Sequence, residues 1–392
     1  MPNWIFDACL PKLYSSTLHL NFAPKLCTGI PMNNYCLEVI RQDLTQTRTV
    51  ELPDPDALSL GNGEAVINVE RFGLTANNIT YGVAGDIIGY WQFFPSEGDY
   101  GRIPVWGMGT VIDAGDTDLK AGDEYYGYYP MASYLVVKPE HVTDRGFTDG
   151  AEHRSALPPV YNQYSLMTAA NGFDREYDSH RMVYYPLFIT GFVLDDFLFD
   201  NDFFNADKII LSSASSKTSF SLAFLLKRNR NRHVVGLTSS GNKAFVESMG
   251  IYDEVVTYDT IETMDASSKI AYVDMAGNRK VLEGIHNHFG DNVTCSCGVG
   301  ITHWDSRDGS KPSTLPGAKP TTFFAPTQIQ KRNKEWGPEK LQAEMQSAWA
   351  DFLESVDGWV TINERKGAGE MQKTYQEVLN GAAPDQSFAI SV

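Results

Sequence analysis

The stretch KIILSSASSKTSFSLAFLLKRNRNRHVVGLTSSGNK, residues 208–243, alternates between short apolar runs and polar turns. Residues 209–211 predict a buried strand, the serine-rich residues 212–219 a turn, and the apolar run 220–226 a helix. A second strand follows at residues 234–237. Strand, helix and strand form a βαβ unit, and open α/β sheets bind ligands at the carboxyl ends of their strands. We therefore expect this stretch to bind a dinucleotide.

Length and charge restrict the class of protein. The chain has 392 residues, of which 42% are hydrophobic, and this is enough for two or three globular domains. Its 32 Lys and Arg are outnumbered by 49 Asp and Glu, which gives a formal net charge of −17. Such a balance disfavours binding to nucleic acid or to an anionic membrane, so an anionic ligand has to be held by a local cluster.

The cysteines and the apolar runs indicate a compartment. The five cysteines are odd in number and contain no CxxC pair, which fits a reducing compartment better than a disulfide framework. No apolar run approaches the roughly 20 residues of a membrane span, and the first 16 residues lack the pattern of a signal peptide. We expect a cytoplasmic protein without a membrane segment.

The rest of the chain divides into a β-rich front and an alternating middle. Residues 36–142 contain short β-branched and aromatic runs broken by Gly, Asp, Pro and Asn, typical of an all-β domain. Residues 148–178 are polar and aromatic and predict an elaborated loop, and residues 184–199 a buried helix. Beyond residue 243 the pattern predicts strands at 254–258, 270–274 and 293–299, helices at 244–249 and 279–289, and an exposed loop at 305–319. A helix at 336–355, a strand at 359–363, a helix at 369–379 and a strand at 387–392 complete the chain, and the alternation predicts a parallel sheet.

Several segments resemble the medium-chain dehydrogenase/reductase superfamily. LGNGEAVINV at residues 60–69, followed by FGLT at 72–75, is similar to the opening strand of that superfamily. VIDAGDTDLKAGDEYYG at residues 111–127 is similar to its VVEVGSGVxxxxxGDxVxG segment. Thr190-Gly191-Phe192 resembles the segment through which the chain enters the cofactor domain of that superfamily. KIILSSASSKTS stands at the position of its VLVxxAxGGVG segment.

The resemblance implies an α/β protein with a β-rich GroES-like catalytic domain and a Rossmann domain on a doubly wound parallel sheet. It assigns residues 1–35 to an N-terminal extension, 36–185 to the catalytic domain, 186–355 to the cofactor-binding domain and 356–392 to a return to the catalytic domain. SSASSKTS, TTFFAP at 321–326 and Lys331-Arg332 resemble a subgroup of unknown function, so no substrate is implied. A homodimer is also implied by the resemblance.

Zinc ligands of the superfamily are missing. Zinc-dependent members use a Cys and a Gly-His-Glu step in the front domain and a four-Cys lobe, but no Cys lies between Cys36 and Cys295. Neither His141 nor His153 has a Cys or carboxylate at ligand spacing, and Cys295 and Cys297 lack partners. The resemblance is therefore to the zinc-free quinone-oxidoreductase and enoyl-reductase branch, and we expect no metal site.

The phosphate-binding turn lacks its glycines. Alignment on the superfamily places Ser216, Lys217 and Ser219 at the three glycine positions, with Ser215 before them and Thr218 between them. Hydroxyls and an ammonium group suit direct phosphate binding at a helix N-terminus; alternatively, these side chains fill the groove. The same letters weakly resemble a nucleoside-triphosphate loop, although Leu211 and Ser216 stand at its two glycines.

The turn after the second strand, residues 238–243, favours NADP(H) over NAD(H). An NAD site has a carboxylate at the end of the second strand, whereas a 2′-phosphate needs a cation. Here no carboxylate follows the strand, and we expect Ser239 and Lys243 around the phosphate; a solvated turn with a surface lysine is the alternative. Thr190 at the domain step and Phe324 near the nicotinamide complete the predicted cofactor contacts.

Candidates for catalysis are hydrogen-bond donors. Without zinc, reduction of a carbonyl needs a group that polarises the oxygen and supplies a proton. Asn78 and Tyr81 lie in the segment that borders the cleft in the resembling enzymes, and Tyr161 and Tyr164 join them if the loop 148–178 folds over the cleft. The first hypothesis is thus a zinc-independent, NADPH-dependent oxidoreductase that reduces an activated carbonyl or enone on a small molecule. The alternatives are a lyase or aldolase-like enzyme and a nucleotide-binding protein on the same scaffold.

Overall fold

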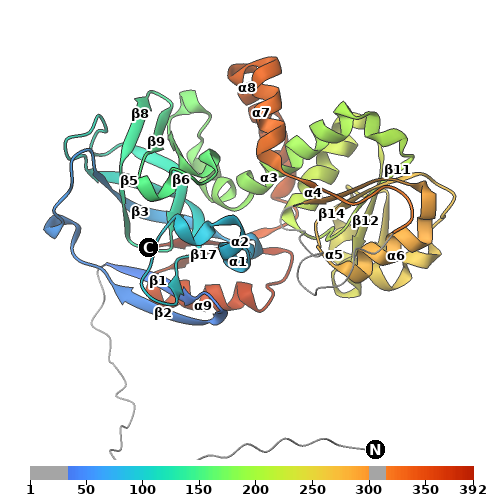
Figure 1. The fold of residues 1–392 in the computed structure, drawn as a ribbon, viewed down its shortest axis with the longest axis horizontal. Helices are drawn as coiled ribbons and strands as arrows, with labels where there is room; N and C mark the ends of the chain where they lie inside the picture. Colours follow the sequence, from blue (N-terminus) through green and yellow to red (C-terminus); the bar gives the residue numbers. More distant parts are fainter. Residues whose placement is uncertain (1–33, 300–314) are drawn as a thin grey trace, which may run out of the picture. The chain divides into compact units, whose positions relative to one another are not determined.

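The computed structural model describes residues 34–299 and 315–392 (Figure 1). The expected N-terminal extension, residues 1–35, lies outside the described residues except for its last two positions. Most of the loop expected at 305–319 also lies outside them, as do Cys9 and Cys27.

Mainly antiparallel strands build the β-rich part of the described chain, in which β17 and β18 pair parallel. Its larger sheet has the order β17-β18-β3-β5-β6-β10-β9-β8, with β7 also paired to β3, and its smaller sheet has the order β2-β1-β4. The C-terminal strand β18 pairs antiparallel with β3, which brings the end of the chain into this sheet. The strands are β1 (Tyr35–Ile40), β2 (Asp43–Glu51), β3 (Ala65–Leu74), β4 (Tyr100–Gly101), β5 (Pro104–Asp113), β6 (Glu124–Pro130), β7 (Tyr134–Val137), β8 (Pro139–Thr143), β9 (Gly146–Asp149), β10 (Gln163–Leu166), β17 (Thr361–Lys366) and β18 (Gln386–Ser391).

The expectation of an all-β front domain is wrong at one point, because two helices follow β3. They are α1 (Ala76–Val83) and α2 (Gly85–Ile88). Thr75 caps α1: the Asn78 side chain accepts a hydrogen bond from the Thr75 backbone N–H at 2.8 Å. Such a reciprocal cap satisfies backbone groups that the first helical turn leaves free, so the polar segment after β3 starts a helix rather than a strand.

The expected loop at 148–178 also contains regular structure. β10 pairs antiparallel with β6 and with β9, so the segment adds a strand to the large sheet. A short 3-10 turn, Pro159–Asn162, precedes β10 and carries Tyr161.

A six-stranded, all-parallel sheet forms the second part of the described chain, with the order β13-β12-β11-β14-β15-β16. The sheet confirms the expected α/β class. Its strands are β11 (Lys208–Leu211), β12 (His233–Thr238), β13 (Glu254–Thr257), β14 (Ile270–Asp274), β15 (Val293–Val299) and β16 (Thr321–Phe323). The helices are α3 (Asp178–Asp200), α4 (Lys217–Leu225), α5 (Lys243–Ser248), α6 (Arg279–Phe289), α7 (Ala325–Trp336), α8 (Pro338–Val356) and, beside the β-rich sheets, α9 (Ala368–Leu379). Helix α7 was not predicted, because its buried positions, Gln328 and Arg332, are polar.

Alternating side chains of the parallel strands build a core on each face of this sheet. Ile209 and Leu211 pack with α3, α4 and α8, whereas Ile210 packs with α6. Successive residues of a strand point to opposite faces, so a continuous apolar run marks a strand covered on both sides.

Helix α3 packs against the larger β-rich sheet and against α4. A Cβ on Gly73 of β3 would lie 2.6 Å from the Met182 carbonyl of α3, and a Cβ on Gly191 of α3 would lie 3.0 Å from the Leu222 backbone N of α4. These glycines therefore permit close packing of α3 on both neighbours. Among the described helices, α3 and its preceding turn are long and apolar enough to span a membrane, but 56% of the apolar window is buried inside the protein, as in a core helix.

Candidate functional site

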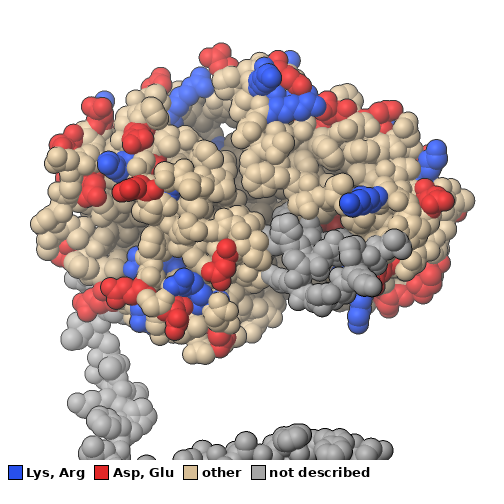
Figure 2. Space-filling view, in the orientation of Figure 1, with Lys and Arg blue, Asp and Glu red and all other residues tan. Residues whose placement is uncertain are grey.

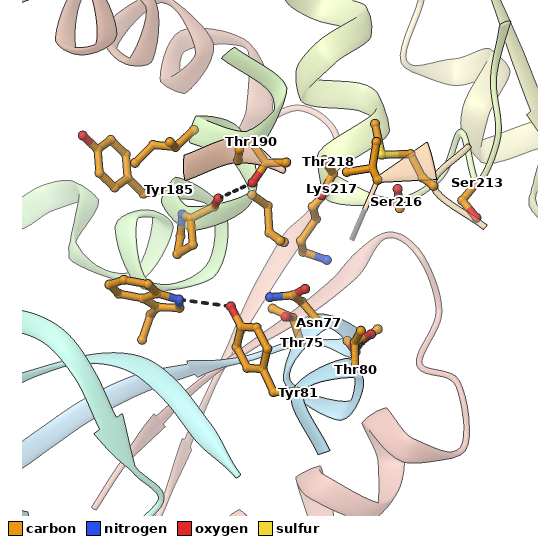
Figure 3. Close-up of a pocket in the computed structure, with 18 of the residues that line it drawn as sticks. Thr75, Asn77, Thr80, Tyr81, Tyr185, Thr190, Ser213, Ser216, Lys217 and Thr218 are labelled. Atoms are coloured by element: carbon orange, nitrogen blue, oxygen red, sulfur yellow. Dashed lines mark hydrogen bonds between the residues drawn. The ribbon is translucent and has the colours of Figure 1, made fainter. Parts of the chain in front are cut away.

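A cavity of about 760 Å³ lies where the polar turns of the parallel sheet meet α1 and the β-rich sheet (Figure 3). Its volume falls within the roughly 300–1,000 Å³ of ligand pockets. Ser213 and residues 215–218 line one side, and Thr75, Asn77, Tyr81 and Trp106 line another. The carboxyl end of β11 thus faces a ligand-sized space, as the βαβ pattern predicts.

The turn after β11 is held by its own hydroxyl groups. Ser216 caps α4, with its Oγ accepting a hydrogen bond from the Ser219 N–H at 3.3 Å. The Ser219 hydroxyl donates to the Ser212 carbonyl at 2.7 Å, is buried, and does not line the cavity. Ser213 has a positive φ of 47° and its N–H donates to the Tyr258 hydroxyl. The serines that replace glycines therefore fold the turn, while Ser215, Ser216 and Thr218 also face the cavity.

A buried carboxylate shapes the neighbouring turn after β14. Asp274 accepts hydrogen bonds from the Ser212 hydroxyl at 2.7 Å and from the N–H groups of Ala276 and Gly277. The Ser212 hydroxyl in turn accepts from the Met275 N–H at 2.8 Å. This network connects the first turn to residues 275–277, which line the cavity.

Lys217 is the first residue of α4, and its side chain extends from the helix toward Asn77 of α1 (Figure 3). Its ammonium group lies 5.8 Å from the centroid of the Tyr184 ring, and no described residue accepts a hydrogen bond from it. Burial lowers the pKa of Lys217 to about 8. Among the described residues that line the cavity, Lys217 alone carries a charged side chain.

The second predicted turn lies mostly outside the cavity. Asn242 lines it and donates a hydrogen bond to the Ser215 Oγ at 3.0 Å, which connects the two turns. Ser239 is exposed, and Lys243 forms an ion pair with Glu247; neither lines the cavity. Their predicted contact with a 2′-phosphate therefore stays a prediction about the surface beside the cavity.

Helix α1 places Tyr81 in the cavity but turns Asn78 away from it. The Asn78 amide donates to the Pro104 carbonyl at 2.9 Å, so this side chain caps α1 and anchors it to β5. Asn77 lines the cavity instead, four residues before Tyr81 and on the same face of the helix. The sequence reading missed Asn77; recognition of Thr75 as a helix cap could have found it.

Tyr81 is a buried hydroxyl donor. Its Oη accepts a hydrogen bond from the Trp106 Nε1–H at 3.3 Å (Figure 3). Burial and the neighbouring Tyr90 raise the pKa of Tyr81 above its ordinary value, and hydrogen bonds with Trp106 and Asn77 oppose this shift. The phenol therefore stays protonated at physiological pH and can donate a hydrogen bond to a ligand oxygen.

The two tyrosines of the segment 148–178 that were predicted as catalytic, Tyr161 and Tyr164, lie in different surroundings. Tyr161 lines the cavity, and its hydroxyl lies 3.0 Å from that of Tyr90. Tyr164 points elsewhere: its hydroxyl donates to the Tyr128 carbonyl and accepts from Arg154, which forms a buried ion pair with Asp149. Tyr161 lies in the 3-10 turn before β10 and Tyr164 in the strand itself, and only Tyr161 reaches the cavity.

Thr190 and Phe324 both line the cavity. The Thr190 hydroxyl donates to the Pro186 carbonyl at 3.1 Å within α3 (Figure 3), and Phe324 is half exposed just before α7. On the face shown in Figure 2, the surface between α1 and α7 consists mainly of uncharged residues, whereas charged side chains gather farther out.

The described residues contain no group of three or more His, Cys, Asp or Glu side chains arranged to hold a metal ion. Cys295 and Cys297 are buried free thiols on β15, and burial raises the pKa of Cys295 to about 12. They act as apolar core residues of the parallel sheet.

The β-rich sheets, the parallel sheet and the cavity at their meeting point define the medium-chain dehydrogenase/reductase fold. The chain resembles the Vibrio vulnificus CurA structure in complex with NADPH, with a TM-score of 0.58 at 12% identity, covering 91% of this chain and 99% of that one. It resembles a Mesorhizobium loti putative NADPH:quinone reductase with a TM-score of 0.58 at 11% identity, covering 93% and 100%. It also resembles the Haloferax mediterranei glucose dehydrogenase in complex with NADP, zinc and gluconolactone, with a TM-score of 0.52 at 12% identity, covering 91% and 99%.

Within this fold, the chain belongs to the family described as protein of unknown function, DUF2855, which matches residues 72–384. No curated protein sequence matches the chain significantly. The resemblance to the superfamily and to a subgroup of unknown function is thereby confirmed.

Proposed function

We propose that this protein is a zinc-independent, NADPH-dependent oxidoreductase that reduces an activated carbonyl or enone on a small molecule. The observation that carries the proposal is the cavity itself, which joins the N-terminus of α4 to the buried Tyr81 hydroxyl. NADPH is bound by CurA from Vibrio vulnificus, whose fold is similar. Cys36, Cys295 and Cys297 are buried free thiols, which fits a protein of the reducing cytoplasm. We also propose that the protein forms a homodimer.

The turn after β11 suits a pyrophosphate despite its missing glycines. Phe220 donates the first intrahelical hydrogen bond of α4, to the Ser216 carbonyl, so the N–H groups of Lys217 and Thr218 precede that bond and are free for a ligand. The hydroxyls of Ser215, Ser216 and Thr218 line the cavity beside them. Helix N-termini bind phosphate through such groups, and we assign the pyrophosphate of NADPH to this turn.

Tyr81 is the proposed catalytic donor. NADPH supplies the hydride when bound. The Tyr81 hydroxyl, held by Trp106 and kept protonated by its raised pKa, donates a hydrogen bond to the carbonyl oxygen where negative charge develops. The hydroxyls of Tyr161 and Tyr90 pair with each other near Tyr81. The surrounding rings exclude water from the reacting carbonyl.

Cofactor binding is tested by titration with NADPH, NADH and ATP, read by thermal shift and by NADPH fluorescence. We expect NADPH to raise the melting temperature by mass action and NADH to bind at least about tenfold more weakly. A preference for ATP would contradict the oxidoreductase hypothesis and favour the alternative of a nucleotide-binding protein. Turnover of a carbonyl without loss of the nicotinamide absorbance would instead indicate a lyase.

The preference for NADPH is tested at Lys243. Lys243→Glu should weaken NADPH about tenfold or more and leave NADH affinity within about twofold, because only NADPH carries the phosphate that the ammonium attracts. Lys120→Glu makes the same charge change on an exposed turn of the β-rich part and is the matched control. Equal losses for both cofactors would reject this assignment of Lys243.

A further inference from the structure

Lys217 presents a positive charge to the cavity that no described lining residue neutralises. Every other described residue that lines the cavity is uncharged, so no Asp or Glu of this lining balances the ammonium. The ammonium has no described hydrogen-bond acceptor and lies 5.8 Å from the centroid of the Tyr184 ring. A partly desolvated charge without a partner is costly, and the N-terminal end of a helix further disfavours a cation. An anionic group of a ligand would remove this cost.

The direction of the side chain separates it from the turn that suits the pyrophosphate. Ser213 and Ser216 lie at the turn itself, whereas Lys217 extends away from them toward Asn77 and the side of the cavity that holds Tyr81 (Figure 3). The charge is thus presented on the side where the proposed reduction takes place. Asn77, Thr75 and Thr80 supply neutral polar groups around it.

Aromatic rings line the side of the cavity that holds Tyr81. The rings of Tyr81 and Tyr90 lie 4.6 Å apart, and those of Trp106 and Tyr126 stack at 5.6 Å. Tyr161 contacts both Tyr90 and Trp106. Such a wall accommodates a planar group better than a polyhydroxylated one, because ring faces stack on flat groups and the Tyr90 and Tyr161 hydroxyls already pair with each other.

We propose that the substrate of this enzyme is an aromatic or conjugated carbonyl compound that bears a carboxylate, and that Lys217 binds this carboxylate. The inference rests on the proposed reductase function and gives Lys217 a role in substrate binding instead of the cofactor contact that the sequence suggested. One ammonium balances one negative charge. A phosphate monoester, with its additional charge, would stay unbalanced in a cavity with no second cation among its described lining residues.

The test compares benzoylacrylic acid with its methyl ester, which differ in the charge that Lys217 would recognise. With NADPH as reductant, we expect the wild-type kcat/KM to favour the acid by about 10- to 100-fold, the range expected for a hydrogen bond between charged groups. In Lys217→Met the ratio of acid to ester should fall to near one, and Lys217→Arg should restore most of it. Lys120→Met is the matched control and should keep the wild-type ratio.

Calorimetric binding of the two compounds to the protein with NADPH provides a readout independent of turnover. If neither compound is reduced, the proposed function fails, and the ratio of the two affinities still decides the role of Lys217. If Lys217→Met weakens NADPH about tenfold and leaves the acid-to-ester ratio unchanged, Lys217 is a ligand of the cofactor phosphate and the proposal is overturned. Equal binding of acid and ester by the wild-type protein also overturns it.

Discussion

At the scale of single residues, the hydroxyl of Tyr81 is the group whose removal should change the chemistry most. Tyr81→Phe keeps the ring but deletes the hydrogen-bond donor, and we expect kcat to fall about 100-fold, as for other groups that stabilise a developing oxyanion. The affinity for NADPH should change little, because the turn after β11 is untouched. Steady-state kinetics with a saturating enone and a separate NADPH titration measure the two quantities.

Tyr129→Phe is the matched control. Its hydroxyl donates to the Tyr125 carbonyl at 2.8 Å in the sheet interior and does not line the cavity. It should lower the free energy of unfolding by about 1 kcal/mol with kcat maintained. Similar losses of kcat in both variants would show that Tyr81 acts through packing rather than through its hydroxyl.

Lys217 predicts a pH dependence that the ester does not share. Burial lowers the pKa of this ammonium to about 8, so the free protein loses the charge as the pH rises through that value. The affinity for the acid should be constant below it and fall by up to about tenfold per pH unit above it, because a proton is then taken up on binding. Calorimetric titrations of acid and ester across this range test the sign, and a parallel fall for the ester would contradict it.

At the scale of elements, the packing of α3 against β3 sets the geometry of the cavity. Gly73→Ala would place a Cβ 2.6 Å from the Met182 carbonyl, and backbone atoms cannot move aside as a flexible side chain can. We expect a loss of about 2 kcal/mol in the free energy of unfolding, measured by urea denaturation, as for other overpacked sites. Gly369→Ala in α9, where a Cβ meets nothing within 4 Å, should be neutral or slightly stabilising. Equal stability of the two variants would mean that α3 shifts freely.

Helix α1 shows how a single cap selects the site residues. The Thr75–Asn78 cap and the Asn78 hydrogen bond to Pro104 fix the rotation of the helix. That rotation directs Asn77 and Tyr81, which share one face of the helix, into the cavity. An element that the sequence reading assigned to β structure therefore supplies the proposed catalytic group.

At the scale of the whole molecule, ligand binding should stabilise both the larger β-rich sheet and the parallel sheet of the described chain. The cavity is lined by residues of both, and α3 packs on both. At an NADPH concentration 100 times its dissociation constant, binding adds about 2.7 kcal/mol to stability, so the melting temperature should rise by several degrees. We expect scanning calorimetry to show that every transition moves upward; a transition that stays in place would show that one sheet unfolds independently of the cofactor.

Local patterns alone determined much of this fold. Apolar runs predicted β14, α6 and β15 with the bounds that the structure has, because a buried parallel strand and an amphipathic helix each leave a short-range signature. The order of these segments indicated a doubly wound sheet, and the absence of cysteines between Cys36 and Cys295 indicated a zinc-free branch. Helix α7 was not predicted, because its buried positions, Gln328 and Arg332, are polar. They pair with Asp196 of α3, which lies far away in the chain.

Only the tertiary structure decided which predicted residues meet. Sequence spacing shows that Asn77 and Tyr81 share a helix face, but the face that borders the cavity depends on how α1 packs against β5. The same holds for Tyr161 and Tyr164, of which only Tyr161 reaches the cavity. The charge of a cavity is a sum over distant segments, so the isolation of Lys217 among the uncharged described residues of the lining becomes visible only when those segments are assembled. Recognition and chemistry depend on that assembly, whereas secondary structure depends mainly on neighbours along the chain.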